Sequence, residues 1–246
     1  MDYLSSGVQK MDIIKSKKTA AVLDARLLAA ASYVRHGSLV ADIGTDHGYL
    51  PIYLILNGVS EKVIVSDINP MPLKKAVKNS EDYGVRAKII PILSDGMDNI
   101  EKSGYFPDDI IICGMGGETI ISIISSSLSA KMDSRRLIIN PMTKTPETRK
   151  FLTKNGFVIK DEKLSKVQGK IYTCICAEGG TQTAASEEYS EVELILGRIN
   201  IRKRDSLFEE YRSEQISRLK KQINGMKKGR LDTSKLEKTL KEIIVL

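Results

Sequence analysis

Aspartates and glycines recur along the first half of this 246-residue chain, each time directly after a short apolar run. Carboxylates beside a flexible glycine backbone can bind ribose hydroxyls, amino groups or a positively charged ligand. A single aspartate is as readily a helix cap or a turn residue, but several after successive runs favour one shared ligand site. The candidate set is Asp42, Gly44, Asp46, Gly48, Asp67, Ile68, Asp95 and Gly96.

The sign of this charge separates two classes of cofactor. A dinucleotide site usually has a G-x-G-x-x-G turn without an acid, so that backbone N–H groups can bind the pyrophosphate. Here the turn reads D-x-G-x-x-x-G, led by Asp42 and with Asp46 where a central glycine would stand. Carboxylates repel a pyrophosphate but suit S-adenosylmethionine, which carries a ribose, an adenine, a sulfonium and an amino group and no phosphate. An NAD(P)-dependent oxidoreductase remains the alternative cofactor-binding class.

Two later loops carry further candidates. Three glycines in Gly114-Met-Gly-Gly117 permit a ligand to approach Gly114, Met115 and Gly116, although a tight strand-to-helix turn has the same pattern. In the loop Asn140-Pro-Met-Thr-Lys-Thr-Pro146, Asn140 can present an amide to a base edge and Lys144 a charge to phosphate, although two prolines also suit a plain polar loop. His47, inside the first glycine turn, either contacts a ligand or braces the loop.

These loops need a sheet that brings them together, and the pattern between residues 37 and 177 predicts one. Short β-branched runs alternate with helical segments, which is typical of a mainly parallel sheet with helices on both faces. The expected strands are 39–42, 63–67, 88–93, 109–113, 137–140, 157–159 and 171–176, and the expected helices are 50–56, 73–83, 118–127 and 146–155. No helix separates the last two runs, so the final strand is expected to be antiparallel.

The chain changes character after Ala177, where a Gly/Thr/Ala/Ser stretch predicts a linker. A long helical pattern begins near residue 187 and is expected to be interrupted at Gly225 and Gly229, with a second helix folding back to form a hairpin. We therefore expect two domains, residues 1–180 and 181–246. An N-terminal helix near Leu23–Val34 precedes the sheet.

Composition narrows the function further. The net charge of +7 lies entirely after residue 197, where 14 Lys or Arg face 7 Asp or Glu, and this surplus suggests an anionic partner such as nucleic acid. Three cysteines and two histidines show no spacing typical of a metal site or a disulfide framework. No apolar run is long enough to span a membrane. We expect a cytoplasmic, metal-free protein.

The chain resembles the bacterial TrmK family, class I methyltransferases that modify N1 of the adenine at position 22 of tRNA. The resemblance extends over nearly the whole chain, C-terminal hairpin included, and its most specific parts are Leu23-Asp-Ala-Arg-Leu27, Asp42-Ile-Gly-Thr-Asp-His-Gly-Tyr-Leu-Pro51, Gly114-Met-Gly-Gly117 and the Asn140-Pro141 loop. It implies a Rossmann-like, seven-stranded α/β sheet with an antiparallel last strand, S-adenosylmethionine as methyl donor and tRNA as substrate.

On this interpretation Asp67 binds the ribose hydroxyls and Asp95 the adenine amino group of the cofactor, while His47, Asn140 and Pro141 position the target base. Adenine N1 has a free lone pair, so alignment with the methyl group matters more than a general base. Phosphate contacts are expected from Lys17, Lys18, Arg26, Lys144 and Arg149.

The expected assembly is a monomer or a weak homodimer through the C-terminal helices. The competing class is an adaptor that retains the cofactor pocket but uses its basic hairpin to bind RNA or protein.

Overall fold

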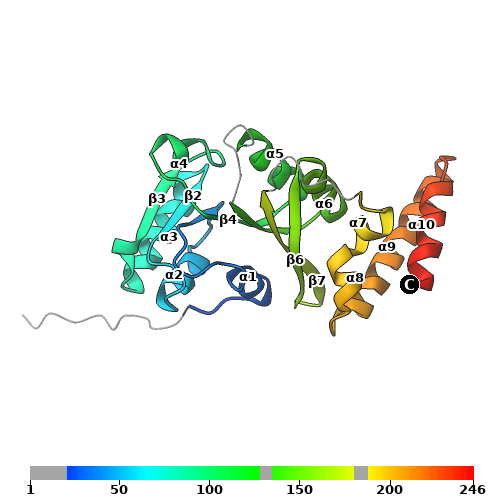
Figure 1. The fold of residues 1–246 in the computed structure, drawn as a ribbon, viewed down its shortest axis with the longest axis horizontal. Coiled ribbons are helices and arrows are strands. Elements are labelled where there is room, and N and C mark those ends of the chain that lie inside the picture. Colours follow the sequence, from blue (N-terminus) through cyan, green and yellow to red (C-terminus); the bar gives the residue numbers. More distant parts are fainter. Residues whose placement is uncertain (1–20, 128–134, 180–187) are drawn as a thin grey trace, which may run out of the picture.

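The computed structural model describes residues 21–127, 135–179 and 188–246 of the chain. Seven strands form one sheet in the order β3-β2-β1-β4-β5-β7-β6 (Figure 1). The strands are β1 Val40–Ile43, β2 Val63–Asp67, β3 Ile89–Leu93, β4 Asp109–Met115, β5 Arg136–Pro141, β6 Phe157–Val167 and β7 Lys170–Gly179. The first five pair in parallel, whereas β7 runs antiparallel to both β5 and β6, which confirms the predicted reversed last strand.

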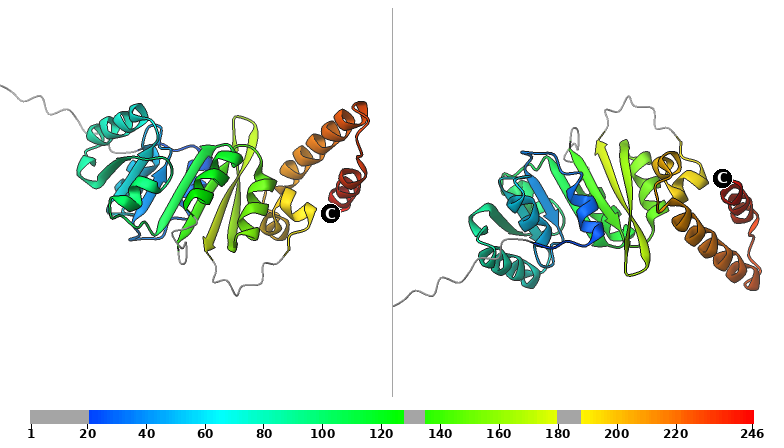
Figure 2. Two further views of the ribbon diagram at one scale, coloured as in Figure 1. Left: turned by 90° about the horizontal axis from the view of Figure 1, so that it is seen from above. Right: turned by 90° about the horizontal axis from the view of Figure 1, so that it is seen from below.

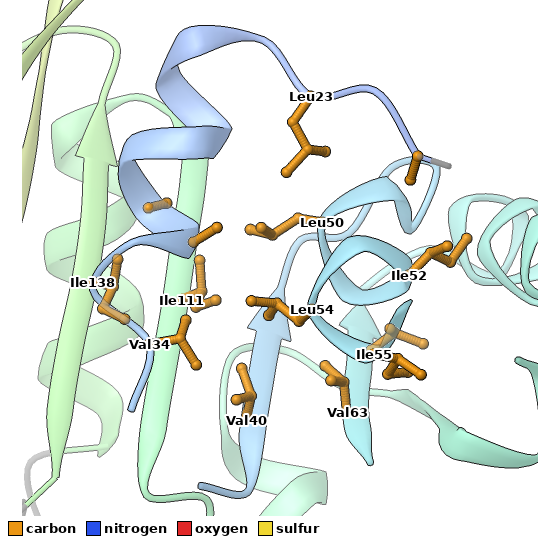
Figure 3. Close-up of a cluster of buried hydrophobic side chains, with 14 of the residues drawn as sticks. Leu23, Val34, Val40, Leu50, Ile52, Leu54, Ile55, Val63, Ile111 and Ile138 are labelled. Carbon is orange, nitrogen blue, oxygen red and sulfur yellow. The ribbon is translucent and has the colours of Figure 1, made fainter. Parts of the chain in front are cut away.

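Helices cover both faces of the sheet because neighbouring strand residues point to opposite sides. Val40 and Val63 pack under one set of helices, whereas Ala41 and Ile64 pack under the other. The first face is covered by α1 Ala25–Ala31, α2 Tyr49–Leu56 and α3 Pro70–Asp82, and Figure 3 shows its apolar cluster. The second face is covered by α4 Asp98–Lys102, α5 Gly117–Ser127 and α6 Thr145–Lys154. A short 3-10 turn, η1 Arg86–Lys88, precedes β3.

Strand β6 is much longer than the expected segment 157–159. Its second half is mostly polar, and it extends because β6 is the edge strand of the sheet and pairs along its length with β7. Gln168 and Gly169 connect the two strands with positive φ values of 49° and 76°, as a two-residue hairpin turn requires. Among the residues that the structure describes, no helix combines the length and apolarity needed to cross a membrane.

Within residues 188–246 the C-terminal module has four helices: α7 Glu191–Leu196, α8 Arg198–Lys203, α9 Phe208–Lys228 and α10 Ser234–Val245. The expectation of one long helix from residue 187 is wrong, because Gly197 at φ 88° and Arg204 at φ 44° break the chain direction. Gly225 lies inside α9 without interrupting it, whereas Gly229 ends it.

The predicted helical hairpin is confirmed. Helices α9 and α10 pack together and project beyond the β6 end of the sheet (Figure 2). The predicted domain boundary at residues 180 and 181 falls outside the described residues.

Candidate cofactor and substrate site

The carboxyl ends of four adjacent parallel strands meet at one edge of the sheet. Ile43 in β1 lies opposite Ser66 in β2 and Ile112 in β4. Beyond β1, the backbone N–H groups of Gly44 and Thr45 donate to the Ser66 carbonyl at 2.7 and 3.0 Å. The strand ends therefore gather the glycine turn, Asp67 and the Gly114 loop into one neighbourhood, as the sequence predicted.

A further backbone bond extends this edge to β3. Ser94 N donates to the Asp67 carbonyl at 3.0 Å, so that Asp67 and Asp95 lie on neighbouring strand ends. Asp67 is half-buried, and its Oδ1 accepts the Asn69 N–H at 2.7 Å, which leaves Oδ2 for a ligand. Asp95 and Ile68 are exposed beside it. Two carboxylates and one apolar side chain thus stand together at the ends of β2 and β3.

The glycines of the site differ in what surrounds them. A Cβ on Gly44 would overlap the Met115 methyl group, and one on Gly48 would lie 2.9 Å from the Ala76 Cβ, so that both glycines serve close packing within the protein. Around Gly114, at φ 77°, no atom of the described residues beyond its chain neighbours lies within 4 Å of the position of a Cβ. Gly114 is therefore the glycine of this set that leaves open space.

The acids of the glycine turn point in different directions. Asp42 is 7% exposed, and burial raises the pKa of its carboxyl to about 6, an effect that the Thr45 hydroxyl partly opposes. Asp46 is exposed and lies 3.1 Å from His47 Nε2 and 3.9 Å from Lys75 Nζ. Asp42 thus belongs to the buried floor of the turn, whereas Asp46 faces helix α3.

His47 follows β1, whereas Asn140 and Pro141 end β5, with one strand between these two. The His47 ring is exposed and stacks on Tyr49 with centroids 5.7 Å apart, and its carbonyl accepts a hydrogen bond from Asn79 of α3 at 2.8 Å. Asn140 lies at the end of β5, and strand β4 separates β5 from β1. The expected joint role of the three residues stays a prediction, and the backbone carbonyl of His47 fixes the glycine turn against α3.

The loops after β4 and β5 are bonded to each other. Met142 N donates to the Met115 carbonyl at 2.8 Å, and Gly117 N donates to the Thr143 carbonyl at 3.0 Å. A Cβ on Gly117 would lie 2.6 Å from that carbonyl, so that this position requires glycine. Gly117 was not among the predicted site residues, although it is the third glycine of the run.

Asn140 is fully buried beneath this pair of loops. Its Nδ2 donates to the Thr173 carbonyl of β7 at 2.9 Å, and its Oδ1 is buried without a hydrogen-bond partner among the described residues. The amide donor that sequence reasoning offered to a base edge is thus used to fix the end of β5 against β7. The second N–H of that amide and its oxygen are the groups that remain for a ligand.

The expected phosphate contacts separate into three groups. Lys144 is exposed at φ 57° and lies 3.2 Å from Glu118, whose hydrogen bond raises the pKa of the ammonium group. Arg26 is half-buried, with Nη1 3.2 Å from the Met142 sulfur and its guanidinium 5.3 Å from the centroid of the Tyr172 ring. Lys17 and Lys18 lie outside the described residues.

The expectation for Arg149 is wrong. Its side chain is fully buried, Nε donates to Glu162 Oε1 at 2.7 Å, and Nη1 donates to the Leu194 and Ile195 carbonyls at 2.7 and 3.1 Å. Arg149 therefore joins the sheet domain to the C-terminal module and has no surface to offer a phosphate. Its partner Glu162 lies in β6, and no spacing in the sequence indicated this pair.

A mainly parallel sheet with a reversed β7, helices on both faces and carboxylates at the ends of β2 and β3 defines a Rossmann-like methyltransferase fold. The chain belongs to the methyltransferase domain family, which matches residues 23–175. The Bacillus subtilis tRNA (adenine(22)-N(1))-methyltransferase is 28% identical over 222 residues, which cover 90% of this chain and 92% of that protein.

Solved structures extend this similarity. A Streptococcus pneumoniae protein in complex with S-adenosyl-L-methionine superimposes with a TM-score of 0.76 and 26% identity, covering 90% of this chain and 99% of that one. TrmK of M. capricolum in complex with S-adenosyl-homocysteine gives a TM-score of 0.73 and 28% identity, covering 90% of this chain and 96% of that one. The similarity therefore includes the C-terminal helices as well as the sheet.

Proposed function

We propose that this chain is an S-adenosylmethionine-dependent tRNA methyltransferase that methylates N1 of the adenine at position 22. The observation that carries the proposal is the row of ligand groups on adjacent strand ends: Asp67 with a free oxygen, exposed Asp95, and Gly114 facing open space. The similarity to the Bacillus subtilis enzyme along most of both chains supports the choice of substrate.

The residues of this edge fit S-adenosylmethionine. Asp67 Oδ2 is placed to accept hydrogen bonds from ribose hydroxyls, Asp95 to accept one from the adenine amino group, and Ile68 to cover the adenine ring. The methionine part of the cofactor lies beside Gly114, Met115 and Gly116. Asp42, which precedes the glycine turn, is the buried acid of this region. Asp46, Gly44, Gly48 and Gly96 shape the surrounding backbone. When bound, S-adenosylmethionine supplies an electrophilic methyl group on a positively charged sulfur.

Catalysis in this proposal comes from alignment. Adenine N1 already carries a lone pair, so no side chain has to remove a proton before the methyl group is transferred. Asn140 anchors β5 and the two bonded loops present Pro141 and Met142 at the edge of the site. These residues hold the target base in line with the methyl group, and the base must first leave its stack because N1 lies on the pairing edge.

The C-terminal module supplies positive charge for the tRNA backbone. Four exposed cations in the second half of α9 and just after it make no ion pair with the described residues: Lys220, Lys221, Lys228 and Arg230. By contrast, Lys227 and Lys235 are neutralised by Glu237 and Glu191. We propose that the unpaired cations bind phosphates and that the protein works in the cytoplasm, where tRNA is available.

We also propose that the chain acts as a monomer. The apolar side of α9 that carries Leu219 shares one cluster with Leu236, Leu240 and Ile243 of α10. The seam that the sequence offered for a dimer is thus used within one chain. Analytical ultracentrifugation tests this expectation, and a concentration-dependent dimer that dissociates when exposed residues of α10 are changed would contradict it.

The decisive experiment combines the protein with methyl-labelled S-adenosylmethionine and unmodified tRNA, followed by digestion and identification of the labelled nucleoside. We expect label in 1-methyladenosine, lost in Asp67→Ala and retained in Asp82→Ala, a control in which an exposed acid of α3 is removed. Cofactor binding without transfer to any tRNA would refute the proposal and favour the adaptor class. Replacement of the tRNA adenine 22 by guanine tests the position.

A further inference from the structure

A cleft of about 720 Å³ separates the Asn140-Pro141 loop from the C-terminal module. Its walls are the loop 141–146, the start of β7 at residues 170–173, and the face of α9 from Glu210 to Arg218. The volume is typical of a site for a small organic group rather than of a surface irregularity. Since the loop residues Met142 and Thr143 are bonded to Met115 and Gly117, the cleft borders the proposed transfer site.

One polar side chain in the cleft has no partner. Gln215 is 8% exposed, and its side-chain amide makes no hydrogen bond with the described residues. The amide nitrogen and oxygen are not enclosed by protein atoms, so their free hydrogen-bonding groups face the cleft. Its neighbours on α9, Ser213 and Ser217, donate their hydroxyls back to the helix at 2.9 and 3.0 Å, so they do not satisfy it. The amide therefore offers one donor group and one acceptor to whatever enters the cleft.

The charges around the cleft favour an anionic ligand. Lys144, Lys170 and Arg218 contribute three cations, of which Lys170 makes no ion pair with the described residues. Of the two carboxylates, Glu210 is neutralised by Lys166 at 2.6 Å, and Glu214 lies 3.9 Å from Arg218. A phosphate at the rim of the cleft would thus meet net positive charge.

An aromatic ring forms part of the wall. Tyr172 is half-buried, and the Arg26 guanidinium lies 5.3 Å from its ring centroid. A flat ring beside a cationic rim and a hydrogen-bonding amide is the combination that binds an unstacked nucleobase, since stacking uses the ring and the amide reads the base edge. The ring matches the face of the base, the amide matches its edge, and the cationic rim matches its phosphate.

We propose that the cleft binds a second nucleotide of the tRNA, one that flanks the target adenine and is also turned out of its stack. This inference rests on the proposed function and adds to it a subsite for substrate selection. Gln215 hydrogen-bonds the edge of the flanking base, Tyr172 contacts its face, and Lys170 binds the adjoining phosphate. The C-terminal module thereby contributes to substrate recognition next to the transfer site as well as at its basic far end.

The test compares Gln215→Leu with Gln222→Leu, the same substitution at an exposed position two turns further along α9. Because Gln215 has no protein partner, leucine leaves no group unsatisfied, and we expect Gln215→Leu to unfold at the same or a higher urea concentration than wild type. We expect KM for unmodified tRNA to rise about tenfold in Gln215→Leu, from loss of one base contact, with kcat and S-adenosylmethionine affinity unchanged. Gln222→Leu should match wild type in every measurement.

A measurement on the wild-type protein guards against a folding defect. With ¹⁵N-labelled glutamine side chains, addition of unmodified tRNA should shift the Gln215 amide signals and leave those of Gln222 in place. An unchanged KM in Gln215→Leu, or Gln215 signals that do not respond to bound tRNA, would overturn the inference. Should wild type bind tRNA but methylate none, the proposed function fails, and the Gln215 signals still decide whether RNA enters the cleft.

Discussion

The buried ion pair between Arg149 and Glu162 gives the sharpest prediction about stability. Both side chains are fully buried, and the pair connects α6 and β6 to the carbonyls that end α7. Arg149→Met removes the cation and leaves the carboxylate of Glu162 in a dry site, where burial already raises its pKa against the opposing effect of Arg149. We expect this variant to lose about 3–5 kcal/mol of unfolding free energy, the usual cost of breaking a buried pair.

Two controls separate the pair from an ordinary loss of a cation. Lys78 forms an exposed pair with Asp82 at 3.1 Å, and Lys78→Met should cost no more than about 0.5 kcal/mol. The double variant Arg149→Met/Glu162→Leu removes both charges and retains most of the volume, so it should lie within about 1–2 kcal/mol of wild type. Urea unfolding at neutral pH, followed by circular dichroism, gives the three values.

The module contacts of Arg149 also predict where the damage begins. Its Nη1 binds the Leu194 and Ile195 carbonyls, and the Tyr211 hydroxyl donates to the same Ile195 carbonyl at 3.0 Å. Limited proteolysis of Arg149→Met should therefore release the C-terminal module before the sheet domain is cleaved. Equal unfolding midpoints for Arg149→Met and Lys78→Met would refute the reasoning, because burial would then have no effect on the cost of removing a cation.

Three further predictions concern the site. Burial raises the pKa of Asp42 to about 6 from its ordinary 3.8, so the folded protein holds this proton more tightly than the unfolded chain; its ionisation lowers stability as pH rises from about 4 to 6, by at most about 3 kcal/mol. Asp42→Asn should remove that pH dependence in urea unfolding, and a variant that retains it would show that another group is responsible. Gly114→Ala should cost about 1 kcal/mol of backbone strain yet weaken S-adenosylmethionine binding at least tenfold, whereas Gly117→Ala, with its Cβ 2.6 Å from a carbonyl, should mainly destabilise the fold; calorimetry of both variants distinguishes these outcomes. Lys144→Ala should reduce the slope of log affinity for tRNA against log salt by about 1, as measured by filter binding, and an unaltered slope would show that Lys144 contacts no phosphate.

The sheet could be predicted because its signals are local. Strand β2 has the expected bounds, since Val63–Asp67 is a β-branched run closed by an acid, and the glycines at 58 and 84 mark the ends of helices. Edge strand β6 was underestimated because half of its length is polar, and a polar strand is recognised only from its partner β7. Local pattern also misjudged the start of the C-terminal module, where Gly197 is required by its close approach to Glu162 and Asn200 rather than by any turn signal.

The carboxylates at the strand ends could be predicted from the sequence, whereas the partners of the other site residues could not. Asp67 and Asp95 follow directly from strand alternation, because parallel strands end at one edge. The partners of Arg149 and Asn140 come from β6 and β7, and those of Gln215 would come from outside the chain, so no spacing within the sequence could reveal them. His47 stands in the predicted loop, but the side of the loop on which it lies depends on α3.

Helix α9 has 21 residues, and its rise of about 1.5 Å per residue separates its two ends by about 30 Å. The first half of α9, as far as Arg218, borders the cleft, and Lys220 and Lys221 follow it directly. Lys228 and Arg230 lie at the far end, where α10 turns back and packs alongside. If the proposed function holds, the length of the hairpin sets the distance along the RNA between the phosphates bound at its far end and the base that reacts. Lengthening α9 and α10 by two turns each would move Lys228 and Arg230 outward by about 11 Å and leave the strand-end residues in place. The choice of RNA and the methyl transfer could then change independently.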